Sequence, residues 1–206
     1  MAALHAAQQH GYAAEVDVQL SADGEVVIFH DYRLKRLTGI SGWMKDRVAK
    51  SIGRLKLKGG SESPPLLRDA LADLPDLPLL IELKMGDIRL APAVAAVLDR
   101  HSGPFAVQSF DPVLVTWFRD HRPDWPRGLI AYENLRYSLN AREPRFRPEF
   151  VKACAPHFAA WRVKDLPAHQ TVLADIPVVT WTVRSPTDRR LAAAYARNII
   201  FEGYLV

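Results

Sequence analysis

The 206-residue sequence predicts an α/β fold, with a (β/α) barrel as the leading architecture. Three observations support this prediction. Short segments rich in Val, Ile and Leu recur along the whole chain, and most are apolar at nearly every position. Such segments are typical of parallel strands that are buried on both faces. Amphipathic helical patterns lie between most of these segments, and Gly, Pro, Asp and Ser mark the junctions.

We expect eight strands, at Ala14–Leu20, Val26–His30, Leu79–Lys84, Ala106–Phe110, Gly128–Tyr132, Ala159–Val163, Val178–Val183 and Asn198–Glu202. The helices between them are expected at Met1–His10, Pro65–Leu74, Ala91–Arg100, Pro112–Asp120 and Thr187–Arg197. Asp111-Pro112 and Ser185-Pro186 have the composition of helix N-termini, and Gly11 that of a helix end.

Two segments interrupt the alternation of strand and helix. Ser21–Gly24 has the composition of a tight turn, so the second strand should return as a hairpin. Residues 32–63 form an insertion, for which we expect one amphipathic helix near Asp46–Leu57. The basic side chains of this helix could contact nucleic acid or anionic lipid, but its apolar residues recur at helical spacing and favour a solvated surface helix.

Composition excludes several classes of protein. The formal net charge is only +4, which suits a small anionic substrate and is far from the basic stripe of a nucleic-acid binder. No apolar run is long enough to span a membrane, and the first residues lack the features of a signal peptide. The single cysteine, Cys154, is expected on a helix as a small apolar side chain. We therefore expect one cytoplasmic domain over residues 1–206, without a nucleic-acid partner or stable membrane insertion, whose oligomeric state the sequence does not indicate.

Two predicted strands contain the candidate site residues. Glu15 and Asp17 alternate along the first strand, so both carboxylates should point to one face. A hard divalent cation between them would relieve their repulsion, whereas an exposed edge strand would leave them solvated. Glu82 and Lys84 alternate in the same way in an otherwise apolar strand, where they form either a structural ion pair or part of a metal and phosphate site.

His30 lies at the end of the predicted returning strand. Its unperturbed pKa lies near neutrality, so a histidine close to a metal and an anion is a candidate general acid or base. A histidine at a strand end is also common as an ordinary polar residue, and the position alone leaves both interpretations open.

Together, the order of these motifs resembles the glycerophosphodiester phosphodiesterase family. Glu-x-Asp-Val-Gln-Leu, Asp-Gly-x-x-Val-x-x-His-Asp and Ile-Glu-Leu-Lys follow one another here, from Glu15 to Lys84. Gln-Ser-Phe-Asp-Pro at 108–112, Trp-Thr-Val at 181–183 and Ile-Phe-Glu-Gly-Tyr at 200–204 are further matches. The resemblance covers residues 6–204.

The resemblance implies a (β/α)8 barrel of the TIM type that hydrolyses glycerophosphodiesters to glycerol 3-phosphate and an alcohol, with a bound divalent cation, Ca²⁺ or Mg²⁺. It implies that His30 is catalytic and that Lys84 holds the phosphate. Further residues follow from the same motifs: the metal ligands Glu15, Asp17 and Glu82, and the pocket residues Phe110 and Trp181.

The chain departs from the family pattern at its start. The family begins with a strand that carries His-Arg-Gly and with a following Glu-Asn pair, and neither occurs here. We therefore expect the first barrel strand to be missing from this chain, with turnover reduced or lost. Two other functions stay open: a non-catalytic barrel that binds phosphodiesters or metal, and a related phospholipase or lyase acting on lipid head groups. A phospholipase or lyase of this kind should expose apolar residues that bind lipid, and the insertion offers only Trp43 and Met44 for this role.

Overall fold

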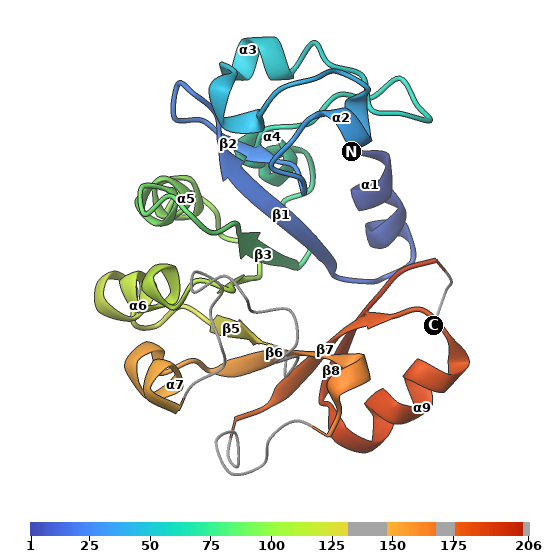
Figure 1. Cartoon of the computed structure of the whole chain (residues 1–206), viewed down its shortest axis with the longest axis vertical. Coiled ribbons are helices and arrows are strands. Elements are labelled where there is room, and N and C mark those ends of the chain that lie inside the picture. The colour runs from blue at the N-terminus through green and yellow to red at the C-terminus, as the bar shows by residue number, and fades with distance from the viewer. Residues whose placement is uncertain (132–147, 168–175, 204–206) are drawn as a thin grey trace. The chain divides into compact units, whose positions relative to one another are not determined.

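The computed structural model describes residues 1–131, 148–167 and 176–203. The chain divides into two compact units, Met1–Ala106 and Val107–Val206. Both units contain strands and helices in alternation, as the sequence predicts, and the strands of the second unit follow one another in Figure 1 along the colour gradient. No helix in the described ranges is long and apolar enough to cross a membrane.

Three strands organise the first unit, β1 (Ala14–Leu20), β2 (Val26–Ile28) and β3 (Leu79–Leu83). β1 pairs antiparallel with β2 and parallel with β3, which confirms the predicted hairpin. The turn between β1 and β2 is closed by Ser21, whose backbone N–H donates to Glu25 O at 2.9 Å and whose Oγ accepts from Glu25 N at 2.9 Å. Gly24 has φ +83°, a conformation that glycine adopts without a steric penalty.

Three helices of the first unit correspond to predicted ones: α1 (Ala2–Gln9), α4 (Leu67–Asp73) and α5 (Leu90–Leu98). α1 ends before Gly11, which has φ +70° as the predicted stop requires. Leu67, Ala70 and Leu71 of α4 are buried, and this helix packs beside β2. The apolar spacing therefore identified the buried face of α4 correctly.

The insertion at 32–63 contradicts the prediction of a continuous helix over Asp46–Leu57. It contains only short pieces: α2 (Lys35–Thr38), η1 (Met44–Asp46) and α3 (Ala49–Ile52). Its apolar side chains instead form a small core, in which Leu34, Met44 and Ile52 pack with Val27 and Phe29 of the hairpin. Leu55 and Leu57 also pack on this core. One straight helix could not direct all of these side chains toward the hairpin, so the backbone turns after Ile52.

The second unit contains strands in chain order, β4 to β8, and each pairs in parallel with the next. The strands are β4 (Phe105–Ser109), whose first two residues belong to the first unit, β5 (Arg127–Ala131), β6 (Phe158–Arg162), β7 (Val178–Val183) and β8 (Asn198–Phe201). Tyr132, at the end of one predicted strand, lies outside the described residues.

The described part of the second unit also contains helices α6 (Pro112–His121), α7 (Pro148–Cys154) and α9 (Pro186–Tyr195) and the short η2 (Val163–Asp165). Asp111 caps α6 by accepting from Val113 N, and Ser185 caps α9 by accepting from Asp188 N. Both caps were predicted from the sequence. Cys154 is a buried free thiol at the end of α7, which confirms its prediction as a small side chain on a helix.

Candidate metal centre and active site

A cluster of three carboxylates lies between β1 and β3 in the first unit. The parallel register places Asp17 opposite Glu82, and Glu15 opposite Leu80. Each of Glu15, Asp17 and Glu82 offers one carboxylate oxygen, and these oxygens all lie within 4.8 Å of one another. The alternation along one strand and the register between two strands therefore bring the three predicted ligands together.

Lys84 supplies positive charge to this cluster. It directly follows β3, and its Nζ lies 2.6 Å from Asp17 Oδ1 and 2.7 Å from Glu82 Oε1. The side chains of Lys84, Asp17 and Glu82 are only 12%, 15% and 11% exposed, so water screens these contacts weakly. The ammonium group thus stands between two acidic side chains.

Burial dominates the electrostatics of the cluster. Burial raises the pKa of Glu82, the Lys84 ammonium opposes this shift, and the neighbouring Asp17 carboxylate adds to it, so that the net pKa is raised. Burial also acts to lower the pKa of Lys84, but the charges of Glu82 and Asp17 outweigh it and the pKa is raised. Lys84 therefore stays charged, but its single positive charge does not balance the negative charge of the carboxylates.

The donor set of the cluster fits a hard divalent cation. Ca²⁺ and Mg²⁺ prefer carboxylate oxygens, and here three such oxygens converge with a negative charge that Lys84 alone does not balance. The sulfur and imidazole ligands that soft metals prefer do not contribute to this group among residues 1–131, 148–167 and 176–203.

His30 lies just beyond β2, close to the carboxylate cluster. Phe29 N donates to Asp17 O at 2.8 Å, which fixes the loop beside β1, and the imidazole is near enough to Glu82 to act against the rise in its pKa. His30 Nδ1 lies 2.7 Å from Asp31 Oδ1, and the His30 side chain is 61% exposed. Arg36 in turn donates to Asp31 Oδ2 at 2.6 Å, and this hydrogen bond is the main reason why the pKa of Asp31 is lowered.

Gln19 lies beside the candidate site, and its role was not predicted from the sequence. Its buried Nε2 donates to Phe29 O at 2.7 Å, Asp31 O at 3.0 Å and, more weakly, His30 O at 3.3 Å. This amide holds the backbone on both sides of His30 against β1. A signal was present in the sequence, because Gln19 continues the two-residue spacing of Glu15 and Asp17 along the same strand face.

Phe110 and Trp181, the two predicted pocket residues, lie in the second unit. Their rings meet edge to face, with centroids 5.6 Å apart and an interplanar angle of 87°. Trp181 Nε1 is buried and has no hydrogen-bond partner in the part of the chain that the structure describes. The structure thus brings the two aromatic residues together.

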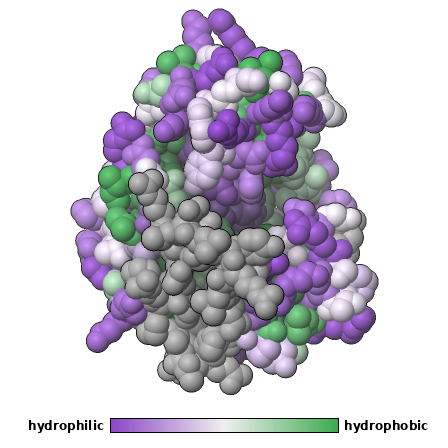
Figure 2. Space-filling model, viewed as in Figure 1, coloured by the Kyte–Doolittle hydropathy of each residue, from purple (hydrophilic) through white to green (hydrophobic). Residues whose placement is uncertain are grey.

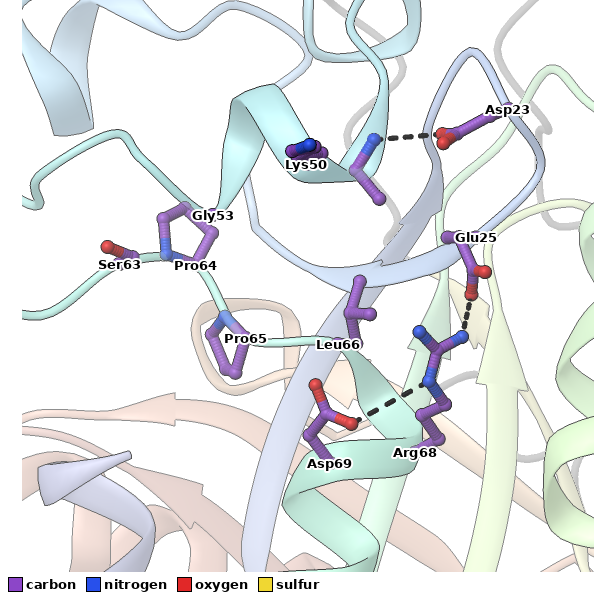
Figure 3. Close-up of a pocket in the computed structure, with 11 residues that line it drawn as sticks. Asp23, Glu25, Lys50, Gly53, Ser63, Pro64, Pro65, Leu66, Arg68 and Asp69 are labelled. Atoms are coloured by element: carbon purple, nitrogen blue, oxygen red, sulfur yellow. Dashed lines mark hydrogen bonds and ion pairs between the residues drawn. The ribbon is translucent and has the colours of Figure 1, made fainter.

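The first unit also has a surface hollow, drawn in Figure 3, and none of the predicted site residues lines it. Besides Lys50, its charged lining residues are Asp23, Glu25, Arg68 and Asp69, and these four contact one another or the backbone. Asp23 accepts from Ala49 N at 2.8 Å, Arg68 pairs with Glu25, and Arg68 Nε lies 3.6 Å from Asp69 Oδ1. None of these four paired groups therefore indicates a ligand site.

Comparison with known proteins identifies the family. Residues 1–202 match the Glycerophosphoryl diester phosphodiesterase family. The chain belongs to this family. This membership agrees with the resemblance drawn from the motifs between Glu15 and Lys84.

Two curated relatives come from Bacillus subtilis. YqiK is 37% identical over 83 residues, which are 36% of this chain and 34% of that protein. YhdW is 33% identical over 134 residues, which are 59% of this chain and 54% of that protein. The matched part of the chain thus spans about half or less of the length of these relatives.

The phosphodiesterase of Oleispira antarctica, solved in complex with the product sn-glycerol-3-phosphate, has a similar structure. The TM-score is 0.80 at 21% identity, and the match covers 97% of this chain and 85% of that one. At this identity the likeness establishes the fold, which is α/β of the TIM-barrel type as the sequence predicts.

Proposed function

We propose that this chain hydrolyses glycerophosphodiesters to glycerol 3-phosphate and an alcohol, and that it requires a divalent cation, Ca²⁺ or Mg²⁺. The observation that carries the proposal is the convergence of the Glu15, Asp17 and Glu82 oxygens beside Lys84 in a member of this family. The product bound by the Oleispira antarctica enzyme supports the same substrate class.

Glu15, Asp17 and Glu82 would hold the cation in this proposal. When bound, a divalent cation supplies Lewis-acid polarisation of a phosphoryl oxygen and stabilises the charge that develops there. Lys84 contacts two of the proposed ligands, so its ammonium stands where it could also attract a phosphate oxygen. The chain would thus neutralise the diester and orient its phosphorus.

His30 would transfer a proton in the reaction. Because the Asp31 carboxylate is ionised and lies 2.7 Å from Nδ1, it favours a proton on that nitrogen and leaves Nε2 as the reacting atom. Neutral Nε2 would accept a proton from an attacking hydroxyl, or the protonated ring would donate one to the leaving alkoxide. Phe110 and Trp181 are proposed as apolar substrate contacts.

The test is the release of glycerol 3-phosphate from glycerophosphocholine, measured with a coupled dehydrogenase assay. Turnover should disappear when EDTA removes the cation and return with added Ca²⁺ or Mg²⁺. His30→Ala should abolish turnover, whereas His10→Ala, which changes an exposed histidine outside the site, should not. Calorimetric titration with Ca²⁺ or Mg²⁺ tests binding separately. Cation binding without any turnover would instead support the non-catalytic barrel.

We also propose that turnover is slow without the His-Arg-Gly motif of the family. The family pattern pairs two histidines, and a positioned acid or base contributes about 10²–10⁴-fold to the rate. We therefore expect slow turnover from the 206-residue chain, and faster turnover from a form extended upstream by a segment encoding His-Arg-Gly. Equal rates for the two forms would show that His30 acts with a different partner.

We also propose that residues 1–206 act as a single domain in the cytoplasm on a small, water-soluble diester. A single cooperative unfolding transition would support one domain. Cell fractionation would test the location.

A further inference from the structure

The insertion at 32–63 concentrates the positive charge of the protein. It contains nine Lys and Arg residues against two acidic residues, a net charge of +7, whereas the whole chain carries +4. Every one of the nine except Arg47 is exposed. Figure 2 shows hydrophilic side chains gathered over the region of α2 and α3, with a few hydrophobic ones among them. The rest of the chain is thus slightly acidic, and the insertion is a strongly basic surface.

Exposed apolar side chains occur in the same segment. Of the seven large hydrophobic side chains that the described residues expose, four lie within residues 32–48. They are Tyr32, Ile40, Trp43 and Val48, between 40% and 46% exposed. Single exposed apolar residues are ordinary, but their concentration within a basic segment suggests a contact surface.

A closed loop brings these two kinds of side chain together. Arg33 and Trp43 form an antiparallel bridge, and Leu34 N donates to Gly42 O at 3.0 Å, so that Ile40 lies in the loop they close. The Arg33 guanidinium lies 4.2 Å from the centre of the Trp43 ring, and Lys45 Nζ lies 5.9 Å from it. We call the surface formed by Arg33, Lys35, Ile40, Trp43 and Lys45 the docking face.

The docking face stands on a firm base. Leu34, Met44 and Ile52 are buried in the small core with the hairpin, and Lys58 N donates to Leu37 O at 2.8 Å beside the loop. Ile40 and Trp43 take no part in that core. Met44, which the sequence offered beside Trp43 as a lipid-binding residue, is buried in it. Their exposure is therefore not a consequence of a poorly packed loop.

We propose that the docking face binds the surface of an anionic lipid bilayer. Charge complementarity favours such a partner, because each Lys or Arg near an anionic membrane strengthens binding by roughly fivefold. Trp43 would sit at the headgroup level, where tryptophan is enriched, and Ile40 would enter the boundary of the acyl chains. This is peripheral binding, so it is compatible with the absence of a spanning helix among the described residues.

Nucleic acid fits the docking face less well. Proteins that bind single strands stack bases on the faces of aromatic rings. Here Arg33 already lies over the Trp43 ring, and the nearby Ile40 has no hydrogen-bonding group for a phosphate or a base edge. A bilayer, in contrast, accepts an aliphatic side chain surrounded by cations.

The docking face also adjoins the proposed active site. Tyr32, which precedes Arg33, donates from its hydroxyl to Met85 O at 3.2 Å, and Met85 directly follows Lys84. Membrane binding would therefore hold the carboxylate cluster close to lipid head groups. The inference goes beyond the proposed hydrolysis and does not depend on it, because binding can be measured without turnover.

The experiment is co-sedimentation of the full chain with vesicles at low salt. Vesicles of phosphatidylcholine alone are compared with an equal mixture of phosphatidylcholine and phosphatidylglycerol. We expect binding only to the mixture, and loss of binding at high salt. Lys35→Gln/Lys45→Gln should weaken binding to the mixture by about 25-fold. Ile40→Ser should weaken it by about fivefold.

A matched control separates the docking face from net charge. Arg100→Gln/Lys152→Gln removes the same charge from two exposed positions outside the insertion, and it should leave vesicle binding unchanged. Equal loss in both double variants would overturn the proposal, as would failure of the unaltered chain to bind the anionic vesicles. Tighter binding to a single-stranded oligonucleotide than to the vesicles, lost in the same Lys35/Lys45 variant, would also overturn it. Circular dichroism verifies that each variant is folded.

Discussion

Each unit has a buried charged side chain on a parallel strand, and the two side chains have different kinds of partner. Glu82 of β3 is 8% exposed and lies among further carboxylates, with Lys84 as its cationic neighbour. Arg127 of β5 is 6% exposed, and its guanidinium donates to the backbone carbonyls of Ala155 at 2.7 Å, Pro123 at 2.9 Å and Cys154 at 3.3 Å.

The difference between them separates a charge that we propose to bind a cation from a structural one. Burial lowers the pKa of Arg127, but arginine stays ionised in proteins, and its donors reach neutral carbonyls that no ligand needs to replace. Burial raises the pKa of Glu82, and the neighbouring Asp17 raises it further against the effect of Lys84. A like-charged cluster of this kind is destabilising by itself, so its presence favours a function such as cation binding.

Replacement of Glu82 should have the largest effect on activity. We expect Glu82→Gln to lower turnover on the order of 10³-fold, because Lewis-acid stabilisation of a transition state is worth several kcal/mol. The same change should not destabilise the cation-free protein, because it removes a buried carboxylate near like charges. Measurements are kcat at saturating cation and urea unfolding with a chelator. Asp76→Asn, at an exposed carboxylate of the same unit, is the control. Undiminished turnover in Glu82→Gln would rule out the cluster as the site.

Replacement of Arg127 should lower stability and leave turnover unchanged. Arg127→Met removes the donors of three backbone carbonyls, and we expect the free energy of unfolding to fall by about 3 kcal/mol. Turnover per folded molecule should stay unchanged, because these carbonyls belong to the second unit and none is a candidate site group. Urea unfolding and kcat at low temperature test both statements, with Arg190→Met at an exposed position of α9 as the control. A selective loss of turnover would mean that Arg127 also serves the reaction.

Gln19 provides an intermediate case, since it also donates to backbone carbonyls but does so beside the site. Gln19→Met should lower the free energy of unfolding by about 2 kcal/mol, because the carbonyls of Phe29 and Asp31 lose a buried donor. Turnover should fall about 10-fold through displacement of His30, with a smaller change in KM. If stability falls while kcat and its pH profile stay constant, the loop is held by Asp31 and Arg36 instead.

The smallest expected effect is a pH dependence of stability that arises from the raised pKa of Glu82. A raised pKa means that the folded state binds the proton more tightly than the unfolded state. The resulting stabilisation is complete below the ordinary value of 4.5 and is lost as pH rises through the folded pKa. The lowered pKa of Asp31, mainly due to Arg36, acts in a separate range, because its contribution is lost only as pH falls below 3.8. Urea unfolding with a chelator across this range should show the decline above pH 4.5, and Glu82→Gln should abolish it.

Local patterns were sufficient for most of the secondary structure. β1 and β7 match their predicted bounds, and the other strands begin or end within two residues of them. The apolar runs and turn residues that mark these strands are local signals, so the sequence carries them directly. The prediction failed for the insertion. Val48, Ile52 and Leu55 have helical spacing, but in the structure Val48 is exposed, whereas Ile52 and Leu55 pack on the core that the insertion forms with the hairpin. In the insertion, packing against the hairpin determined the backbone conformation, and the helical spacing of the apolar residues did not.

For the candidate site, the sequence by itself determined the chemical groups and their spacing along each strand. It placed Glu15 with Asp17 and Glu82 with Lys84, because the two-residue period of a strand is a local property. Only the tertiary structure decided which groups meet: the parallel register sets Asp17 opposite Glu82, Lys84 bridges the two, and Gln19 holds the backbone around His30. Register and long-range hydrogen bonds depend on how distant segments pack, and no short stretch of sequence contains that information.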